Sequence, residues 1–156
     1  MRTNDTMIIS LLRDNSRISL TRMSKITKIP ISTLYERLKN FNKGLIRKHT
    51  ALVDFAQLGF SARARVLLKV PKEELQNLRT SLISCPALNE LYKINNGYDF
   101  MAEFIFATMK DLEEYLDKLG EQFSLEKEEV FYIIDELRRE EFLSKAQIWM
   151  LGERGK

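Results

Sequence analysis

The chain has 156 residues, of which 44% are hydrophobic and 30% are charged, so it is long enough for two small packed domains. No apolar run reaches the roughly 18 residues of a membrane helix, and the polar start MRTNDTMIIS does not resemble a secretory signal. The single cysteine, Cys85, excludes an internal disulfide and a cysteine metal cluster. We therefore expect a soluble, cytoplasmic protein without a membrane partner.

Positive charge is concentrated at the N-terminal end. Residues 1–60 hold eleven Lys or Arg and four Asp or Glu, a net charge of +7, whereas the rest hold 14 basic and 18 acidic residues, a net charge of −4. A basic surface of this kind suits a polyanion such as nucleic acid. An ordinary solvated charged surface is the alternative.

Three short helices are predicted in the first 48 residues. Apolar spacing indicates one helix over residues 4–14 and a second over residues 20–27, with Ser19 as its N-cap. The third lies within IPISTLYERLKNFNKGLI, residues 29–46. Its buried face comprises Leu34, Leu38 and Phe41, and Gly44 is expected in the left-handed C-cap position.

This order predicts a helix-turn-helix unit, which places its third helix in the major groove of DNA. Hydroxyl and amide side chains on such a helix can bond base edges or phosphates, while Lys and Arg neutralise phosphate charge. The alternative is a plain amphipathic helix whose polar face meets only water.

The remainder predicts strand, helix, strand, strand, helix, strand. After a linking strand over residues 49–60, the expected elements are a strand at 62–70, a helix opened by Pro71, strands near 88–94 and 98–106 around an Asn95-Asn96-Gly97 turn, a helix ending at Gly120, and a strand including residues 130–134. This is the split βαββαβ pattern. Both helices would cover one face of the sheet. The other face carries several apolar side chains, so we expect it to be covered by a second copy of the chain in a sheet-mediated homodimer.

The chain resembles the Lrp/AsnC, or feast/famine, transcriptional regulators of archaeal type over residues 3–143. Four motifs carry the resemblance: the opening helix with its Asn15-x-Arg17-Ile18-Ser19 exit, Ile29 to Arg37 as turn and recognition helix, Lys48 to Phe60 as linker, and Asn96-Gly97-Tyr98-Asp99 near the family's ligand-binding turn. Two departures are a segment one residue shorter between Arg37 and Gly44, and Asn96 where the family has glycine.

The resemblance implies an α+β protein and a domain plan. Residues 1–48 would form a winged-helix-like helix-turn-helix domain, 49–60 a linker strand, 61–143 a ferredoxin-like βαββαβ dimerisation and effector domain, and 144–156 a C-terminal tail. It also implies a sequence-specific regulator that binds double-stranded DNA as a homodimer, with tetramers or octamers as higher assemblies. An amino acid or related small molecule would be its effector, and no cofactor, metal or catalytic residue is expected.

The resemblance can be applied to individual positions of this sequence, which gives candidate DNA contacts and a candidate effector turn. Base or phosphate contacts are expected from Ser32, Thr33, Tyr35 and Lys39, and phosphate contacts from Arg22, Lys25, Lys28 and Lys48. Arg37 would contact a phosphate or pair internally with an acid such as Asp14. The effector turn comprises Asn96, Gly97, Tyr98 and Asp99, where Asp99 has either an effector role or a structural role as acceptor of turn N–H groups.

Two other functions stay open. The chain could be a sensor or assembly module that has lost DNA binding, or an enzyme similar to siroheme decarboxylases, which depend on histidines. This chain has a single histidine, His49, in the linker. The apolar tail residues Ile148 to Leu151 predict packing on the protein's own surface or on a neighbouring subunit.

Overall fold

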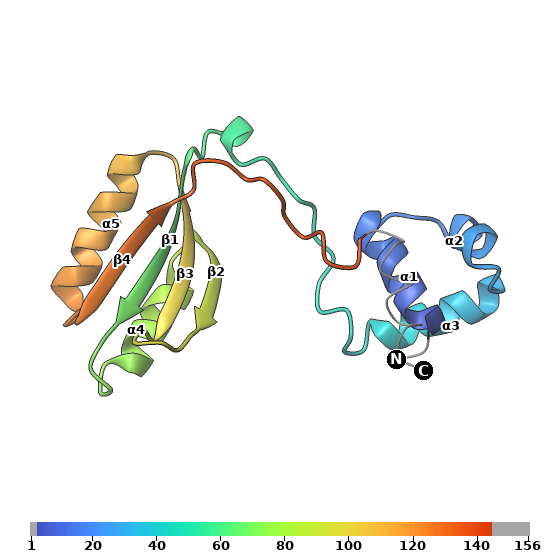
Figure 1. Cartoon of the computed structure of the whole chain (residues 1–156), viewed down its shortest axis with the longest axis horizontal. Coiled ribbons are helices and arrows are strands. Elements are labelled where there is room, and N and C mark those ends of the chain that lie inside the picture. Colours follow the sequence, from blue (N-terminus) through green and yellow to red (C-terminus); the bar gives the residue numbers. More distant parts are fainter. Residues whose placement is uncertain (1–2, 145–156) are drawn as a thin grey trace. The chain divides into compact units, whose positions relative to one another are not determined.

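A computed structural model describes residues 3–144, which divide into two compact units (Figure 1). The N-terminal unit extends to Leu52 and takes in the chain again from Leu137, and the C-terminal unit is Val53–Glu136. Two covalent connections therefore join the units, one on each side of the C-terminal unit.

The N-terminal unit is built on three helices, as the sequence predicts. They are α1 (Thr3–Asp14), α2 (Leu20–Thr27) and α3 (Ile31–Phe41). Ser19 caps α2 as expected, because its hydroxyl accepts the backbone N–H of Arg22 at 3.2 Å. The core side chains come from all three helices and from the turn before α3: Ile8, Met23, Ile29 and Leu34. No β-strand forms in the described part of this unit.

The end of α3 differs from the prediction. Gly44 does not adopt a left-handed conformation, and the helix ends at Phe41 with Asn42 still right-handed. Consecutive tight turns, including a Gly44 N–H bond to the Phe41 carbonyl at 3.2 Å, satisfy the last carbonyl groups instead. The left-handed cap lies at the end of α2, where Lys28 has φ = 59°.

The linker strand predicted over residues 49–60 does not form. A strand needs a hydrogen-bonded neighbour, and no described segment pairs with these residues. They include a short 3₁₀ helix, η1 (Ala56–Leu58), before which the Asp54 carboxylate accepts the Ala56 N–H at 3.1 Å. Gly59 follows with φ = 88°, which a residue without a Cβ adopts without strain.

The C-terminal unit is the predicted βαββαβ sandwich. Its elements are β1 (Ala62–Lys69), α4 (Leu75–Ser84), β2 (Leu88–Lys93), β3 (Phe100–Phe106), α5 (Met109–Gln122) and β4 (Lys127–Tyr132). The strands lie in the order β2-β3-β1-β4, and β1 pairs antiparallel with both β3 and β4. The turn between β2 and β3 is confirmed, since Asn96 and Gly97 have φ of 63° and 86°.

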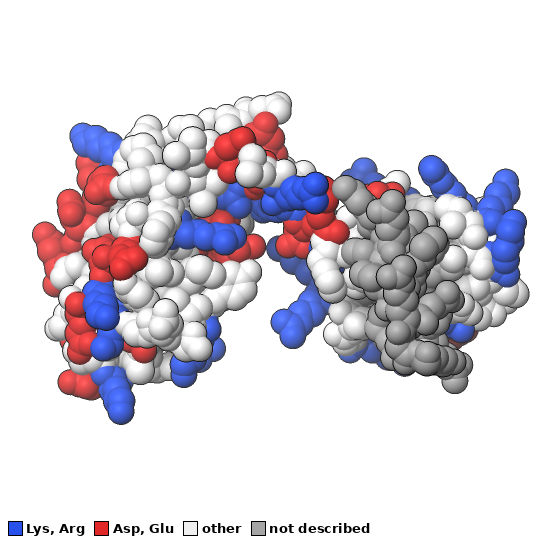
Figure 2. All heavy atoms as spheres, viewed as in Figure 1, with Lys and Arg blue, Asp and Glu red and all other residues white. Residues whose placement is uncertain are grey.

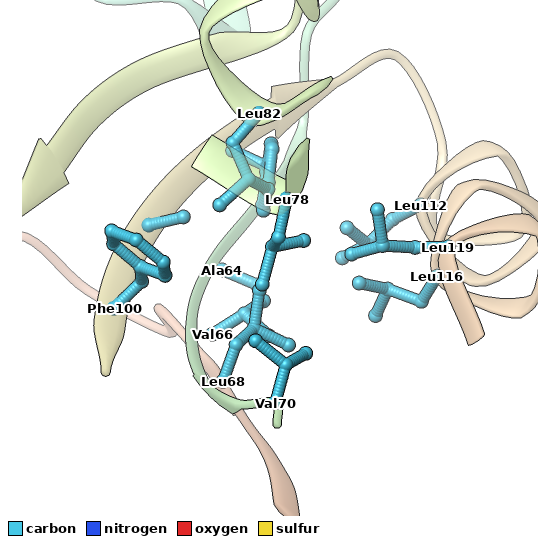
Figure 3. Packing of buried hydrophobic residues seen from close by; sticks show 12 residues of the cluster. Ala64, Val66, Leu68, Val70, Leu78, Leu82, Phe100, Leu112, Leu116 and Leu119 are labelled. Carbon is cyan, nitrogen blue, oxygen red and sulfur yellow. The ribbon is translucent and has the colours of Figure 1, made fainter. Parts of the chain in front are cut away.

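One face of the sheet packs against both helices. Alternate residues of β1 are buried as the sequence pattern predicts, and leucines of α4 and α5 meet them from two sides (Figure 3). The fully buried residues on these two helices are Leu78, Leu82, Leu112 and Leu119. This burial fixes the register of β1, because a slip by one residue would expose its whole apolar side.

Three details of this unit differ from the predictions. Pro71 opens a turn, closed by a Glu74 N–H bond to its carbonyl at 3.0 Å, and α4 starts only at Leu75. Gly120 does not end α5, because the helix continues to Gln122 and keeps Leu119 buried. The last strand begins at Lys127, since β1 pairs with its polar first half, and Ile134 lies beyond it.

Residues 137–144 group with the N-terminal unit. The Arg13 side chain on α1 donates to the carbonyls of Phe142 at 2.5 Å and Glu140 at 2.8 Å, and pairs with the Glu140 carboxylate at 2.7 Å. We call residues 137–144 the return segment. The apolar residues Ile148 to Leu151 of the predicted tail lie outside the described residues.

Candidate nucleic-acid interface

The outer face of α3 is polar and exposed. Ser32, Thr33 and Lys39 are exposed on this helix, whose opposite side is anchored by the fully buried Leu34. Tyr35 is also exposed, with 56% of its surface accessible. The burial of Leu34 therefore fixes which side chains α3 presents to a ligand.

The turn between α2 and α3 is held by short-range hydrogen bonds. Ser24 donates its hydroxyl hydrogen to the Ile29 carbonyl at 2.7 Å, and the Thr27 hydroxyl accepts the Ile29 N–H at 3.2 Å. Pro30 precedes α3 and provides no side-chain cap, so the first N–H groups of α3 have no side-chain acceptor there. The chain thus fixes the start of α3 while leaving polar groups at its N-terminus for an external acceptor.

The predicted phosphate contacts are all exposed. Arg22 and Lys25 lie on α2, Lys28 ends that helix, and Lys48 follows α3. Basic atoms project from the N-terminal unit in Figure 2, and acidic atoms are more frequent over the C-terminal unit. The basic side chains accompany α3 on neighbouring elements of the same unit, where they would add electrostatic attraction for a polyanion.

Arg37 is paired within the N-terminal unit. Its guanidinium donates to the Asp5 carboxylate at 2.5 Å, and only 24% and 22% of the two side chains are exposed. Its partner is not Asp14, the example chosen from the sequence. Asp5 lies in the first turn of α1, and the spacing of residues in the sequence does not distinguish it from Asp14 as the partner. The pair links α3 to α1, and the Asp5 carboxylate neutralises the charge of Arg37.

Two residues of the predicted effector turn, Tyr98 and Asp99, make contacts within the C-terminal unit. The Asp99 carboxylate accepts the Val70 N–H at 3.2 Å. The Tyr98 hydroxyl donates to the Glu129 carboxylate, a bond that raises the pKa of Tyr98, and the Lys127 ammonium lies 5.6 Å from the Tyr98 ring centroid. Asn96 and Gly97 remain exposed at the tip of the turn.

A buried carboxylate on the uncovered sheet face was not singled out from the sequence. Glu103 is only 1% exposed and accepts hydrogen bonds from Asn89 at 2.6 Å, Arg65 at 3.0 Å and Arg63 at 3.1 Å. Burial acts to raise the pKa of Glu103, but its bonds to Asn89 and Arg65 and the nearby Arg63 charge hold the pKa below its usual value. In the strand predicted over residues 98–106, Glu103 alternates with Ala102 and Phe104 and so lies on the other face, but this spacing does not show that three donors converge on its carboxylate.

The same face carries apolar side chains around this cluster. Tyr92 and Phe131 are about half exposed, at 47% and 51%. Leu67, Met101 and Ile105 are half-buried beside them. Neither helix covers these residues, so the uncovered face combines an internally neutralised centre with apolar surroundings.

Three further features concern metal binding, the single histidine and membrane-spanning helices. Within residues 3–144 no three His, Cys, Asp or Glu side chains lie close enough to hold a metal ion. His49 is exposed, with its Nε2 3.3 Å from the Asn42 side-chain oxygen, and it does not lie in a strand. Within the same residues no helix is long and apolar enough to cross a membrane.

Comparison with known proteins identifies the family. Residues 1–46 match the model of winged helix-turn-helix DNA-binding domains. The HTH-type transcriptional regulator FL11 of Pyrococcus furiosus is 31% identical over 117 residues, which cover 74% of this chain and 78% of that protein. The chain belongs to the Lrp/AsnC family of transcriptional regulators.

Solved structures of transcriptional regulators share the fold over most of the chain. B. subtilis LrpC has a TM-score of 0.80 at 19% identity, covering 88% of this chain and 97% of its own. E. coli AsnC has a TM-score of 0.79 at 15% identity, covering 89% and 95%. The regulator NMB0573 of Neisseria meningitidis, solved as a complex with L-Met, has a TM-score of 0.81 at 15% identity, covering 89% and 93%. At these identities the likeness concerns the fold.

Proposed function

We propose that this Lrp/AsnC regulator binds specific double-stranded DNA sites by inserting α3 into the major groove. The observation that carries the proposal is the exposed polar face of α3, fixed by the burial of Leu34 and by the Arg37–Asp5 pair. The net charge of +7 over residues 1–60 favours DNA as the ligand. The protein would act in the cytoplasm as a regulator rather than as an enzyme.

The side chains divide into two roles. Ser32, Thr33 and Tyr35 would contact base edges, because they lie in the N-terminal half of α3, which enters the groove in helix-turn-helix proteins. The exposed basic residues would contact phosphates and set affinity without reading sequence: Arg22, Lys25, Lys28, Lys39 and Lys48. Arg37 would act indirectly, by holding α3 against α1.

A homodimer formed through the uncovered sheet face would present two copies of α3. The face offers exposed Tyr92 and Phe131 beside half-buried apolar residues, and its central Glu103 is already neutralised by Arg63 and Arg65. In a two-fold symmetric dimer the same face of each subunit packs against that of the other, so both copies of this face would be buried. Tetramers or octamers would be assemblies of such dimers. A species of about 18 kDa by light scattering at micromolar concentration would contradict the dimer; the chain itself is 18.3 kDa.

An amino acid or related small molecule is the proposed effector. Asn96 and Gly97 are exposed at the tip of the β2–β3 turn, next to the Tyr98 ring and the Lys127 ammonium. The methionine complex of the N. meningitidis regulator supports this class of ligand. Because the Asp99 carboxylate holds Val70, this residue would shape the turn as well as any ligand contact.

The test is fluorescence anisotropy of the full chain with its own promoter fragment and with scrambled DNA, across a salt series and with or without the twenty amino acids. We expect tighter binding to the promoter and a steep loss of affinity with salt. In the Lys39→Ala variant the slope of log affinity against log salt should flatten by about 1, because one phosphate contact is lost. A change of affinity with amino acids present would support the effector.

A matched control is Lys118→Ala, which removes an exposed lysine from α5 in the other unit. It should leave the salt slope unchanged. Absence of binding to any DNA at low salt would contradict the proposed function, whereas equal slopes for Lys39→Ala and the unaltered chain would remove Lys39 alone from the interface.

A further inference from the structure

The first residue of α3 is an exposed isoleucine. Ile31 keeps 46% of its surface accessible, although it lies one turn before Tyr35 in a helix whose core residue Leu34 is fully buried. It belongs neither to the buried core of the N-terminal unit nor to the half-buried side chains packed on that core. The folded unit therefore leaves nearly half of the surface of this large apolar residue accessible.

The surroundings of Ile31 restrict what can cover it. Ser32 and Thr33 follow it and are exposed, and the first turn of α3 contains no acidic residue. Exposed Lys28 precedes it by three residues. An occupant must therefore be apolar where it meets Ile31 and accept hydrogen bonds and positive charge around that point.

The major groove of DNA meets both conditions at thymine. The 5-methyl group of thymine is apolar, and it lies between base-edge acceptors and the negatively charged phosphate backbone. Ile31 and Tyr35 are spaced by four residues, so their side chains lie one above the other on the same side of α3. Together they offer an apolar strip beside the polar face formed by Ser32 and Lys39.

We propose that Ile31 is a specificity-determining residue that packs against the methyl group of a thymine in each half-site. This inference rests on the proposed function, because it requires α3 to enter the major groove. In this proposal an apolar residue, and not a hydrogen-bonding one, recognises the thymine. Tyr35 extends the same contact by one turn.

The experiment replaces single thymines of the bound DNA with deoxyuridine, which removes only the methyl group and leaves base pairing intact. The site is first selected from randomised DNA with the full-length protein. At one thymine of each half-site, we expect the replacement to weaken binding by about fourfold, the effect of one buried methyl group. The Ile31→Ala variant should bind the thymine and deoxyuridine sites equally.

The Ile26→Ala variant is the matched control. Ile26 lies on α2 and is exposed to a similar extent, at 42%. This variant should keep the fourfold difference between the thymine and deoxyuridine sites, since Ile26 is outside the strip. Agreement of all three proteins with these expectations establishes the contact through a double-mutant cycle.

Several outcomes overturn the inference without touching the proposed function. They are specific binding that no deoxyuridine replacement changes, a selected half-site without thymine, or an Ile31→Ala variant that still distinguishes the two bases. A smaller assembly mass for Ile31→Ala by light scattering would assign Ile31 to a protein contact and also overturn it. Failure to bind any DNA would instead contradict the proposed function itself.

Discussion

The N-terminal unit packs its helices around four buried apolar side chains, whereas the C-terminal unit packs a sheet and two helices around twelve, among the residues that the structure describes. The smaller unit leaves the polar side of α3 and many basic residues exposed. The larger unit buries most of one sheet face and even a carboxylate, Glu103. The difference indicates that the N-terminal unit has less apolar burial to spare, while the C-terminal unit is the more stable scaffold.

The two units also use arginine differently. In the N-terminal unit Arg37 pairs with Asp5 across two helices, and both side chains stay about one-quarter exposed. In the C-terminal unit Arg63 and Arg65 converge on the fully buried Glu103. A buried charge depends strongly on its partners, so the second arrangement should be more sensitive to loss of one member.

The largest expected effect separates the two cores. Leu34→Ala removes a fully buried side chain from the small core and should cost about 4 kcal/mol, enough to unfold the N-terminal unit. Hydrogen exchange of the full chain should then show lost protection in α1 to α3, unchanged protection in β1 and β3, and no DNA binding.

Leu82→Ala is the matched change in the larger core, where Leu82 is equally buried. It should weaken protection in the sheet and leave the three N-terminal helices protected. Loss of protection throughout the chain in both variants would show that the two units unfold together, which would contradict the expected difference in their stability.

A second, smaller effect concerns the buried carboxylate. Glu103→Gln leaves Arg63 and Arg65 without their shared negative charge and should cost about 3 kcal/mol in the C-terminal unit. The amide signals of β1, followed by NMR of the full chain through a urea series, measure this loss. The exposed Glu121→Gln on α5 is the control and should change the midpoint little.

The same carboxylate predicts a dependence on pH. The pKa of Glu103 is lower in the folded state, so the unfolded state binds its proton first as pH falls. Its stabilising contribution is therefore complete above the pKa of the unfolded state and is lost as pH falls through the lower pKa of the folded state. Glu103→Gln should remove this part of the pH dependence, and an unchanged pH profile would contradict the assignment.

The smallest effect concerns the return segment. Arg13→Ala removes the bonds to the Phe142 carbonyl and to Glu140. Because the Arg13 and Glu140 side chains are 33% and 50% exposed, the cost should stay below about 1 kcal/mol. Hydrogen exchange should become faster in residues 137–144 and stay unchanged in the sheet. The exposed Arg17→Ala, just after α1, should have neither effect. Equal exchange in both variants would show that Arg13 does not hold the segment.

Local sequence determined most elements because their signals depend on neighbours in the chain. Ser19 caps α2 since its hydroxyl reaches an N–H three residues on, and β1 alternates because one of its sides must be buried. Asn96 and Gly97 turn the hairpin because both tolerate positive φ. The exposed polar residues of α3 follow in the same way from helical spacing around Leu34.

The tertiary structure decided what depends on partners distant in the chain. Whether residues 49–60 form a strand depends on a pairing segment, which the described chain does not supply, and Asp5 rather than Asp14 meets Arg37 because α1 and α3 pack at that end. The carboxylate of Glu103 can be buried because its three donors reach it from two strands, Arg63 and Arg65 from β1 and Asn89 from β2. Spacing along a sequence carries the period of an element, but the partner of a side chain is set by the packing of whole elements.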